Sequence, residues 1–299
     1  MSKIAIIVDS SFAIPLEKRN RYHIMQVSLP IIFGDEAYRE ESDIQDVAAL
    51  IKLIDEKKDL PATSQPSPGE WIEALNQAKA IGYDTAILMT LSSGISGSYQ
   101  TVTNVAASYE GMAVYTWDSR ITVIAAGHQA LLAATLADQG VDAERIMAAL
   151  NQLRQTMGVR FAVNDISHLQ RTGRISTGQA LIGGLLNIKP ILSINLVLDG
   201  KIAAVGKSRK MSGALKEIKL ALTEALSTVA YPVRITVIDA NNQKLGDKWQ
   251  AELQKEYPTI QFERSAMAPS IAVHTGAGAI AVVWEHDWQD LVRTTTINS

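Results

Sequence analysis

The stretch from Ala86 to Val102 constrains the possible folds of this chain more than any other segment. It begins with a mostly apolar, branched run, Ala86–Leu91, which is typical of a strand buried in a parallel sheet. A short run of serines follows, in which Gly94 and Gly97 would allow a tight turn, and helical character begins at Ser98. Such a strand, loop and helix gather backbone N–H groups and the positive end of a helix dipole around one point. We therefore expect an anion-binding site at this loop.

Length and composition limit the class of protein. A chain of 299 residues exceeds the usual size of a single hydrophobic core, so we expect two domains. Apolar residues make up 47% of the chain and aromatic residues only 6%, which predicts an aliphatic interior. The formal net charge of −3 gives no support for a nucleic-acid partner. The absence of cysteine excludes disulfides and thiolate metal sites and fits a reducing compartment.

Two apolar segments bear on localisation. The N-terminal segment, Ser2–Asp9, is typical of a strand that ends in a carboxylate, and it is too short for a signal peptide. The most apolar long segment, Val123–Ala137, contains His128 and Gln129, which favours a buried helix over a membrane span. We expect a cytoplasmic, soluble protein without stable membrane insertion.

Strand-like and helix-like segments alternate through the first half of the chain. We expect strands at Ile4–Val8, Met25–Phe33, Ala86–Leu91 and Met112–Trp117. We expect helices at Ile44–Lys58, at 67–81 and, as a pair, from about Ile121 to Met157. The helix at 67–81 has Ser67 as its N-cap and Glu70 three residues later, as in a capping box. The alternation predicts a mainly parallel sheet flanked by helices.

Three of these strands end in polar residues: Asp9-Ser10, Ser92-Ser93 and Asp118-Ser119. Ligands of parallel sheets bind beyond the carboxyl ends of the strands, so this convergence indicates a site. The two aspartates are also typical of helix caps or loop braces, and Ser93, Ser96 and Thr63 of turn chemistry. Thr63 begins a polar loop, 63–66, to which the sequence assigns no local structural role.

Hairpins mix with helices from about residue 160 onward. We expect strands at Arg160–Asn164, Lys189–Ile194, Leu196–Leu198, Lys201–Val205, Val233–Ile238 and Ile260–Ser265. We expect helices at Thr177–Leu186, Met211–Leu226 and Gln243–Glu256. Asp199-Gly200 predicts a hairpin turn, and Ile271–Trp284 resembles two apolar runs joined by a glycine turn. The prediction is an α/β domain over residues 1–160 and an α+β domain over residues 161–299.

Positive charge is concentrated in one part of the second domain. Between Gln170 and Lys210 there are seven cationic residues and a single acid, Asp199. Such a run is usually a solvated face. Arg174 lies in a glycine-containing turn and Arg209 follows a predicted strand, and these positions also suit a phosphate or carboxylate partner.

Several common cofactor motifs are missing or incomplete. The chain contains no Walker A sequence, so a phosphate-binding P-loop is excluded. The run Gly276–Ala281 matches a dinucleotide fingerprint by letters, but a strand is predicted to follow it instead of a helix. The five histidines show no paired ligand spacing, so we expect neither a metal site nor a cofactor.

One enzymatic interpretation stays open at this point. Ser96 lies in Gly94-Ile-Ser-Gly-Ser98, one residue short of the nucleophile motif of α/β-hydrolases, and Asp239 and His274 follow in the order of a catalytic triad. No upstream His-Gly-Gly motif supplies an oxyanion loop. The alternative function is therefore a lipid esterase with Ser96 as its nucleophile.

A series of short motifs resembles the DegV family of fatty-acid-binding proteins, the lipid-carrying subunits of bacterial fatty acid kinase. The matching motifs are Asp9-Ser10-Ser11, Thr63–Pro66, Leu91–Gln100, Asp118-Ser119, Gly173–Ser176, Lys189-Pro190 and His274–Gly278. They occur in order across nearly the whole chain. Two departures are small: Ser11 stands where the family usually has threonine, and Arg171-Thr172-Gly173 stands where two glycines are common.

The resemblance implies a two-domain fold with one long-chain fatty acid in a tunnel between the domains. It implies that Thr63 and Ser96, with Ser93 beside them, hold the carboxylate. It places Arg174, Arg209 and His274 at the head-group rim or at a docking site for a kinase subunit. It implies no catalytic residue and no cofactor in this chain. Burial of a methylene contributes about 0.8 kcal/mol, so the tail would supply affinity while the hydroxyls fix orientation.

Overall fold

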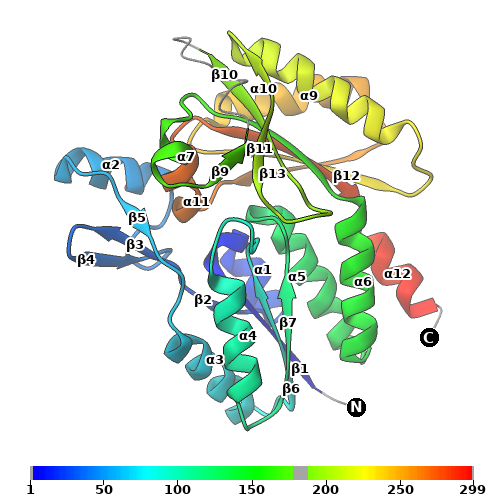
Figure 1. Cartoon of the computed structure of the whole chain (residues 1–299). Coiled ribbons are helices and arrows are strands. Elements are labelled where there is room, and N and C mark those ends of the chain that lie inside the picture. Colours follow the sequence, from blue (N-terminus) through cyan, green and yellow to red (C-terminus); the bar gives the residue numbers. More distant parts are fainter. Residues whose placement is uncertain (1–2, 178–187, 298–299) are drawn as a thin grey trace.

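Two β-sheets, each with its own helices, form most of the molecule (Figure 1). The computed structural model describes residues 3–177 and 188–297. The first sheet has the order β2-β1-β6-β7, and all of its neighbouring strands are parallel. Its strands are β1 (Ile4–Asp9), β2 (Met25–Val27), β6 (Thr85–Thr90) and β7 (Ala113–Asp118). The predicted parallel sheet is confirmed.

Helices cover both faces of the first sheet. On one face lie α3 (Pro68–Ala80) and α4 (Ser98–Ser108), which pack against the sheet through Trp71 and Val102. The capping box of Ser67 and Glu70 starts α3 as predicted. On the other face lies α5 (Val123–Asp138), which is buried nearly all round because α6 (Ala143–Thr156) and α12 (Trp288–Ile297) cover it (Figure 1).

The second sheet is mixed and has the order β13-β12-β14-β8-β10-β11-β9. Its strands are β8 (Gly158–Ala162), β9 (Ile175–Thr177), β10 (Lys189–Ile194), β11 (Ile202–Ser208), β12 (Val233–Asp239), β13 (Gln261–Ala266) and β14 (Ile280–His286). One face packs on α9 (Met211–Leu226) and α10 (Gln243–Glu256). The opposite face, which carries Val159, Phe161 and Val283, belongs to the same core as the first sheet. The fold is therefore a parallel sheet flanked by helices joined to a second, mixed α/β layer.

A small third sheet, β4-β3-β5, lies beside the other two. Its strands are β3 (Pro30–Phe33), β4 (Glu36–Arg39) and β5 (Ala62–Thr63). The predicted strand at Met25–Phe33 is thus two strands in different sheets. The predicted loop at Thr63 is also wrong in part, because Thr63 pairs with Ile31. Short helices complete this region: η1 (Ser10–Phe12), α1 (Leu16–Arg21), α2 (Val47–Lys57), α7 (Ser167–Arg171) and α11 (Pro269–Thr275).

Two segments of the second half differ from their predictions. Residues 196–199 form a turn and not a strand, and the Gly200 N–H donates to the Asn195 carbonyl at 2.7 Å. The first apolar run of Ile271–Trp284 is the helix α11, which has Pro269 at its N-terminus; the second run is β14, so a strand does follow Gly278. The predicted helix at Thr177–Leu186 lies outside the described residues, except Thr177, which ends β9. Within residues 3–177 and 188–297, no helix is both long and apolar enough to cross a membrane.

Candidate functional site

A cavity lies between the two large sheets. The volume of this cavity is about 220 Å³. Most of its wall is apolar and comes from both halves of the chain: Leu29, Leu91, Ile95, Ile121, Val123, Val159, Phe161, Leu169, Ile194, Ile202, Ile238, Met267, Ile271, Ala281 and Val283. Polar side chains are fewer, and they include four of the residues singled out from the sequence: Thr63, Ser96, Arg174 and His274.

Thr63 and His274 form a direct hydrogen bond across the cavity wall. The Thr63 Oγ1 to His274 Nε2 distance is 2.7 Å, although the residues are 211 positions apart. β5 carries Thr63 and α11 carries His274, so the third sheet and the helix after β13 meet at this contact. The pair is half-buried, with the hydroxyl and the imidazole at the cavity surface.

The imidazole of His274 is neutral in the free protein. Burial, together with the positive charge of Arg174, lowers the pKa of His274 to about 3. Its Nδ1 is buried and has no hydrogen-bond partner among the described residues. A buried N–H without an acceptor is costly, so the proton belongs on Nε2, which then donates to Thr63 Oγ1. The Thr63 hydroxyl hydrogen is left to donate to another group.

Ser96 sits where the loop after β6 becomes α4. Its backbone N–H donates to the Ser92 carbonyl at 3.1 Å, and its Oγ lies 2.9 Å from Ser98 Oγ. The Ser98 N–H, at the start of α4, donates to Ser96 Oγ at 3.2 Å. The hydroxyl therefore lies at the positive end of a helix dipole, where a carboxylate is stabilised.

The glycines of this loop allow close packing as well as the turn. Residues 93–95 form the predicted turn, in which the Ile95 N–H donates to the Ser92 carbonyl at 3.1 Å, although neither Gly94 nor Gly97 has a left-handed backbone. A Cβ on Gly94 would lie 2.3 Å from the Asp199 carbonyl oxygen, and one on Gly97 would lie 2.2 Å from Gln65 Oε1. The loop is pressed between the β10–β11 turn and the segment after β5, which fixes Ser96 in the cavity wall.

The strand-end aspartates brace this loop. Asp9 is fully buried and accepts hydrogen bonds from the Leu91 N–H at 2.8 Å and the Ser11 N–H at 3.1 Å. Burial raises the pKa of Asp9 to about 7. Asp118 accepts from the Ser93 and Arg120 N–H groups, each at 3.0 Å. β1, β6 and β7 are neighbours, so their polar ends do converge as predicted, but both carboxylates face the backbone.

Arg174 reaches the cavity, whereas Ser93 and Arg209 do not. Arg174 donates from Nε to the Ile95 carbonyl at 3.4 Å, just ahead of Ser96. Ser93 is exposed and donates its hydroxyl to Asp118. Arg209 is also exposed and follows the end of β11. Because β9 and β11 are parallel with Ile175 opposite Ile202, Arg174 and Arg209 lie at opposite ends of this pair, separated by about 26 Å of strand.

The three residues of the esterase alternative do not form a triad. Ser96 Oγ is hydrogen-bonded to Ser98, and the Nε2 of His274 to Thr63. Asp239 binds Arg264 at 2.6 Å and the Asn242 N–H at 2.6 Å, so it does not orient His274. A nucleophile, base and orienting carboxylate need a continuous chain of hydrogen bonds, which these side chains lack.

Comparison with known proteins agrees with this cavity-bearing fold. The model of the DegV family matches residues 3–287. The protein DegV of Bacillus subtilis is 36% identical over 283 residues, which cover 94% of this chain and 98% of that protein. This chain belongs to the DegV family.

Solved structures of DegV-family proteins have the same fold. The crystal structure of DegV from Bacillus subtilis, described as a fatty-acid-binding protein, has a TM-score of 0.86 and 35% identity, and the match covers 96% of this chain and 100% of that one. A DegV-family protein from Thermus thermophilus, described in terms of its fatty acid binding, has a TM-score of 0.86 and 26% identity, covering 95% and 99%.

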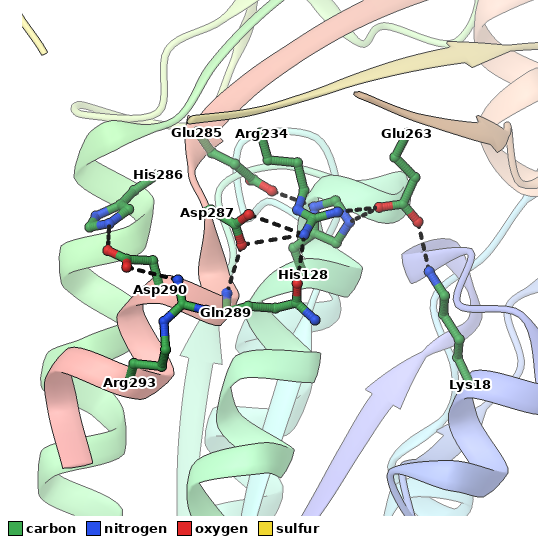
Figure 2. A network of polar contacts seen from close by, with 10 residues as sticks. All are labelled: Lys18, His128, Arg234, Glu263, Glu285, His286, Asp287, Gln289, Asp290 and Arg293. Carbon is green, nitrogen blue, oxygen red and sulfur yellow. Dashed lines mark hydrogen bonds and ion pairs between the residues drawn. The ribbon is translucent and has the colours of Figure 1, made fainter. Parts of the chain in front are cut away.

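A buried polar network in this DegV-family chain was not predicted from its sequence (Figure 2). His128 on α5 is fully buried between Glu285 of β14 and Glu263 of β13, with its Nε2 3.2 Å from Glu263. Arg234 and Lys18 also bind Glu263, at 3.1 and 2.6 Å. Burial alone would lower the pKa of His128, but Glu285 and Glu263 raise it to about 9. In contrast to His274, this imidazole is charged at neutral pH.

The network had no signal in the sequence because its members come from separate elements. The five residues named above lie on α1, α5, β12, β13 and β14, and no spacing in the sequence relates them. His128 was noted only as a polar interruption of an apolar helix. Across residues 3–177 and 188–297, no group of three or more histidine, aspartate and glutamate side chains is placed to hold a metal ion.

Proposed function

We propose that this chain binds one long-chain fatty acid, with the carboxylate held by Thr63 and Ser96 and the tail in the aliphatic cavity. One observation carries the proposal: a cavity with mostly apolar walls also contains Thr63, Ser96, a neutral imidazole and Arg174. The DegV proteins of Bacillus subtilis and Thermus thermophilus, described as binding fatty acids, support it.

The chemistry of the polar residues suits a carboxylate. The Thr63 hydroxyl is free to donate, because His274 Nε2 already donates to its oxygen. Ser96 adds a second hydroxyl at the N-terminus of α4, and Arg174 adds positive charge. A hydrogen bond to a charged group contributes about 1.5–3 kcal/mol, whereas a long tail contributes on the order of 10 kcal/mol before the cost of association.

We propose that the chain is a carrier and that a partner fatty acid kinase phosphorylates the bound acid. The kinase would supply ATP and magnesium, which places the carrier in the cytoplasm. Arg209 lies outside the cavity and is exposed, as expected for a docking residue. Binding and presentation need no nucleophile, and Ser96 lacks the hydrogen-bonded base that an esterase requires.

Native mass spectrometry of the purified protein, followed by lipid extraction, tests the binding. We expect one fatty acid per chain in the wild type and no retained lipid in the Thr63→Ala/Ser96→Ala double variant. The control is Thr103→Ala/Ser108→Ala, which removes the same two residue types from the exposed face of α4. Unchanged lipid content in the first variant would place the head group elsewhere. Labelling of Ser96 by a fluorophosphonate, together with ester turnover, would instead favour the esterase.

A further inference from the structure

Met267 separates the cavity from a second hollow. We call this second hollow the α1–β13 cleft, and its volume is about 300 Å³. It is surrounded by η1, the segment that leads into α1, α5, β13 and the start of α11, and its lining includes Ile14, Ile124, Ala268 and Pro269. Of the described residues, Met267 is the one that lines both hollows.

Along β14 the cavity ends at a buried cluster of paired charges. Val283 and Ala281 point into the cavity from β14, and the next residue on the same face is Glu285, about 7 Å further along the strand. Glu285 binds the buried His128, and Arg234 lies directly opposite it on β12 (Figure 2). An acyl chain cannot extend in this direction without displacing paired, buried charges, which is strongly unfavourable.

Met267 is a much softer part of the wall. Its backbone is fixed, because its N–H donates to the Asp239 carbonyl at 2.8 Å. Its side chain accepts one weak hydrogen bond, from the Thr275 hydroxyl to Sδ at 3.1 Å. An unbranched thioether with three rotatable bonds adapts its shape more readily than the branched residues around it. A rotation of this side chain is the smallest change that would join the two hollows.

The cleft would accept the methyl end of a chain and not a second head group. The wall nearest Met267 is apolar, with Ile124, Ala268 and Pro269. The rest of its lining carries four acidic residues against one cation, Arg264, so the acidic side chains outnumber it and disfavour a carboxylate. An acyl chain that passes Met267 would therefore have its carboxylate on the side of Thr63.

We propose that Met267 sets the longest acyl chain that this protein holds, and that the α1–β13 cleft receives the terminal carbons when Met267 is displaced. The inference rests on the proposed fatty acid binding. Each further buried methylene group raises the affinity for the fatty acid about fourfold. The position of Met267 between the two hollows therefore has a large effect on chain-length selectivity.

The test uses the delipidated full-length protein and an equimolar excess of saturated straight-chain fatty acids from C12 to C24. The bound mixture is measured by native mass spectrometry. We expect Met267→Ala to raise the ratio of bound C22 to bound C16 at least tenfold over the wild type. Met267→Phe, which fills the same position with a stiffer side chain, should shift the bound mixture to shorter chains.

Met157→Ala is the matched control, because Met157 has a similar burial but lines neither hollow. It should leave the C22 to C16 ratio unchanged. A ratio in Met267→Ala and Met267→Phe equal to that of the wild type, at full lipid occupancy, would refute the role of Met267. If the wild type binds no fatty acid at all, the proposed function itself is wrong. That result differs from the one that refutes only the role of Met267.

Discussion

Replacing Thr63 with valine tests the head-group geometry most directly. Valine keeps nearly the same shape but removes the hydroxyl that lies 2.7 Å from His274 Nε2. The complex then loses one charge-assisted hydrogen bond to the carboxylate, a net contribution of about 1.5–3 kcal/mol. The dissociation constant should rise roughly 10- to 150-fold. The tail contacts are unchanged, so the variant should still bind at saturating fatty acid.

The assay is isothermal titration of delipidated protein with a saturated fatty acid at pH 7. Thr103→Val is the matched control, because the Thr103 hydroxyl bonds the Tyr99 carbonyl on the exposed face of α4. The control should bind as the wild type does. A dissociation constant for Thr63→Val within threefold of the wild-type value would refute the role of this hydroxyl.

The proposed role of the Thr63 hydroxyl requires that the imidazole of His274 is neutral. A pKa of about 3 in the free protein means that the imidazole stays neutral from pH 5 to 8. Because this pKa is below the unfolded value of about 6.5, the neutral form stabilises the fold above pH 6.5, and this contribution is lost as the pH falls toward 3. An NMR titration of the lipid-free protein should show no change at His274 between pH 5 and 8. A midpoint near 6.5 would contradict the tautomer that leaves Thr63 free to donate.

Three further predictions concern residues outside the cavity. Because the pKa of His128 is about 9, its charged form contributes on the order of 3 kcal/mol to the free energy of unfolding below pH 6.5, and this contribution is lost as the pH rises through 9. Urea unfolding should show this loss of stability in the wild type and a flatter pH profile in His128→Gln. Parallel profiles of the two proteins would contradict the prediction. Gly94→Ala should cost about 1–3 kcal/mol or more, because its Cβ meets backbone. Gly206→Ala, with its nearest neighbour at 3.5 Å, is the control, and equal unfolding energies would refute the clash. Arg209→Ala should keep its lipid but be phosphorylated more slowly by a fatty acid kinase; loss of lipid would instead assign Arg209 to binding.

The first sheet was predictable because the hydrophobic pattern of each strand indicates whether its faces are buried. The run at Ala86–Leu91 is apolar except at Thr90, and both faces of β6 are indeed buried. Ser67 and Glu70 cap α3 through contacts three residues apart, so a local pattern suffices. The predicted boundary near residue 160 falls within β8, the strand with which the second sheet begins. The domain limits remain a prediction.

The site was only partly predictable because its contacts are not local. Loop residues such as Ser96 were found through the strand, glycine and helix pattern around them. The bond between Thr63 and His274 joins residues 211 positions apart, and nothing in the sequence pairs them without the family resemblance. The same limit applies to His128, whose partners lie more than a hundred residues away. Arg209 was grouped with Arg174 by charge, although strand direction separates them.

The helix α11, which the sequence showed only as an apolar run, carries contacts to both Thr63 and Met267. Two adjacent residues of this helix bind different side chains: His274 binds Thr63, in the proposed head-group site, and Thr275 binds Met267, between the cavity and the α1–β13 cleft. A change in one contact should therefore alter the other, because residues that share a backbone element or a cavity couple by about 0.5–3 kcal/mol. We expect Thr63→Val and Met267→Ala to be non-additive in a double-mutant cycle of C16 binding. Additivity within about 0.5 kcal/mol would show that α11 holds the two contacts independently.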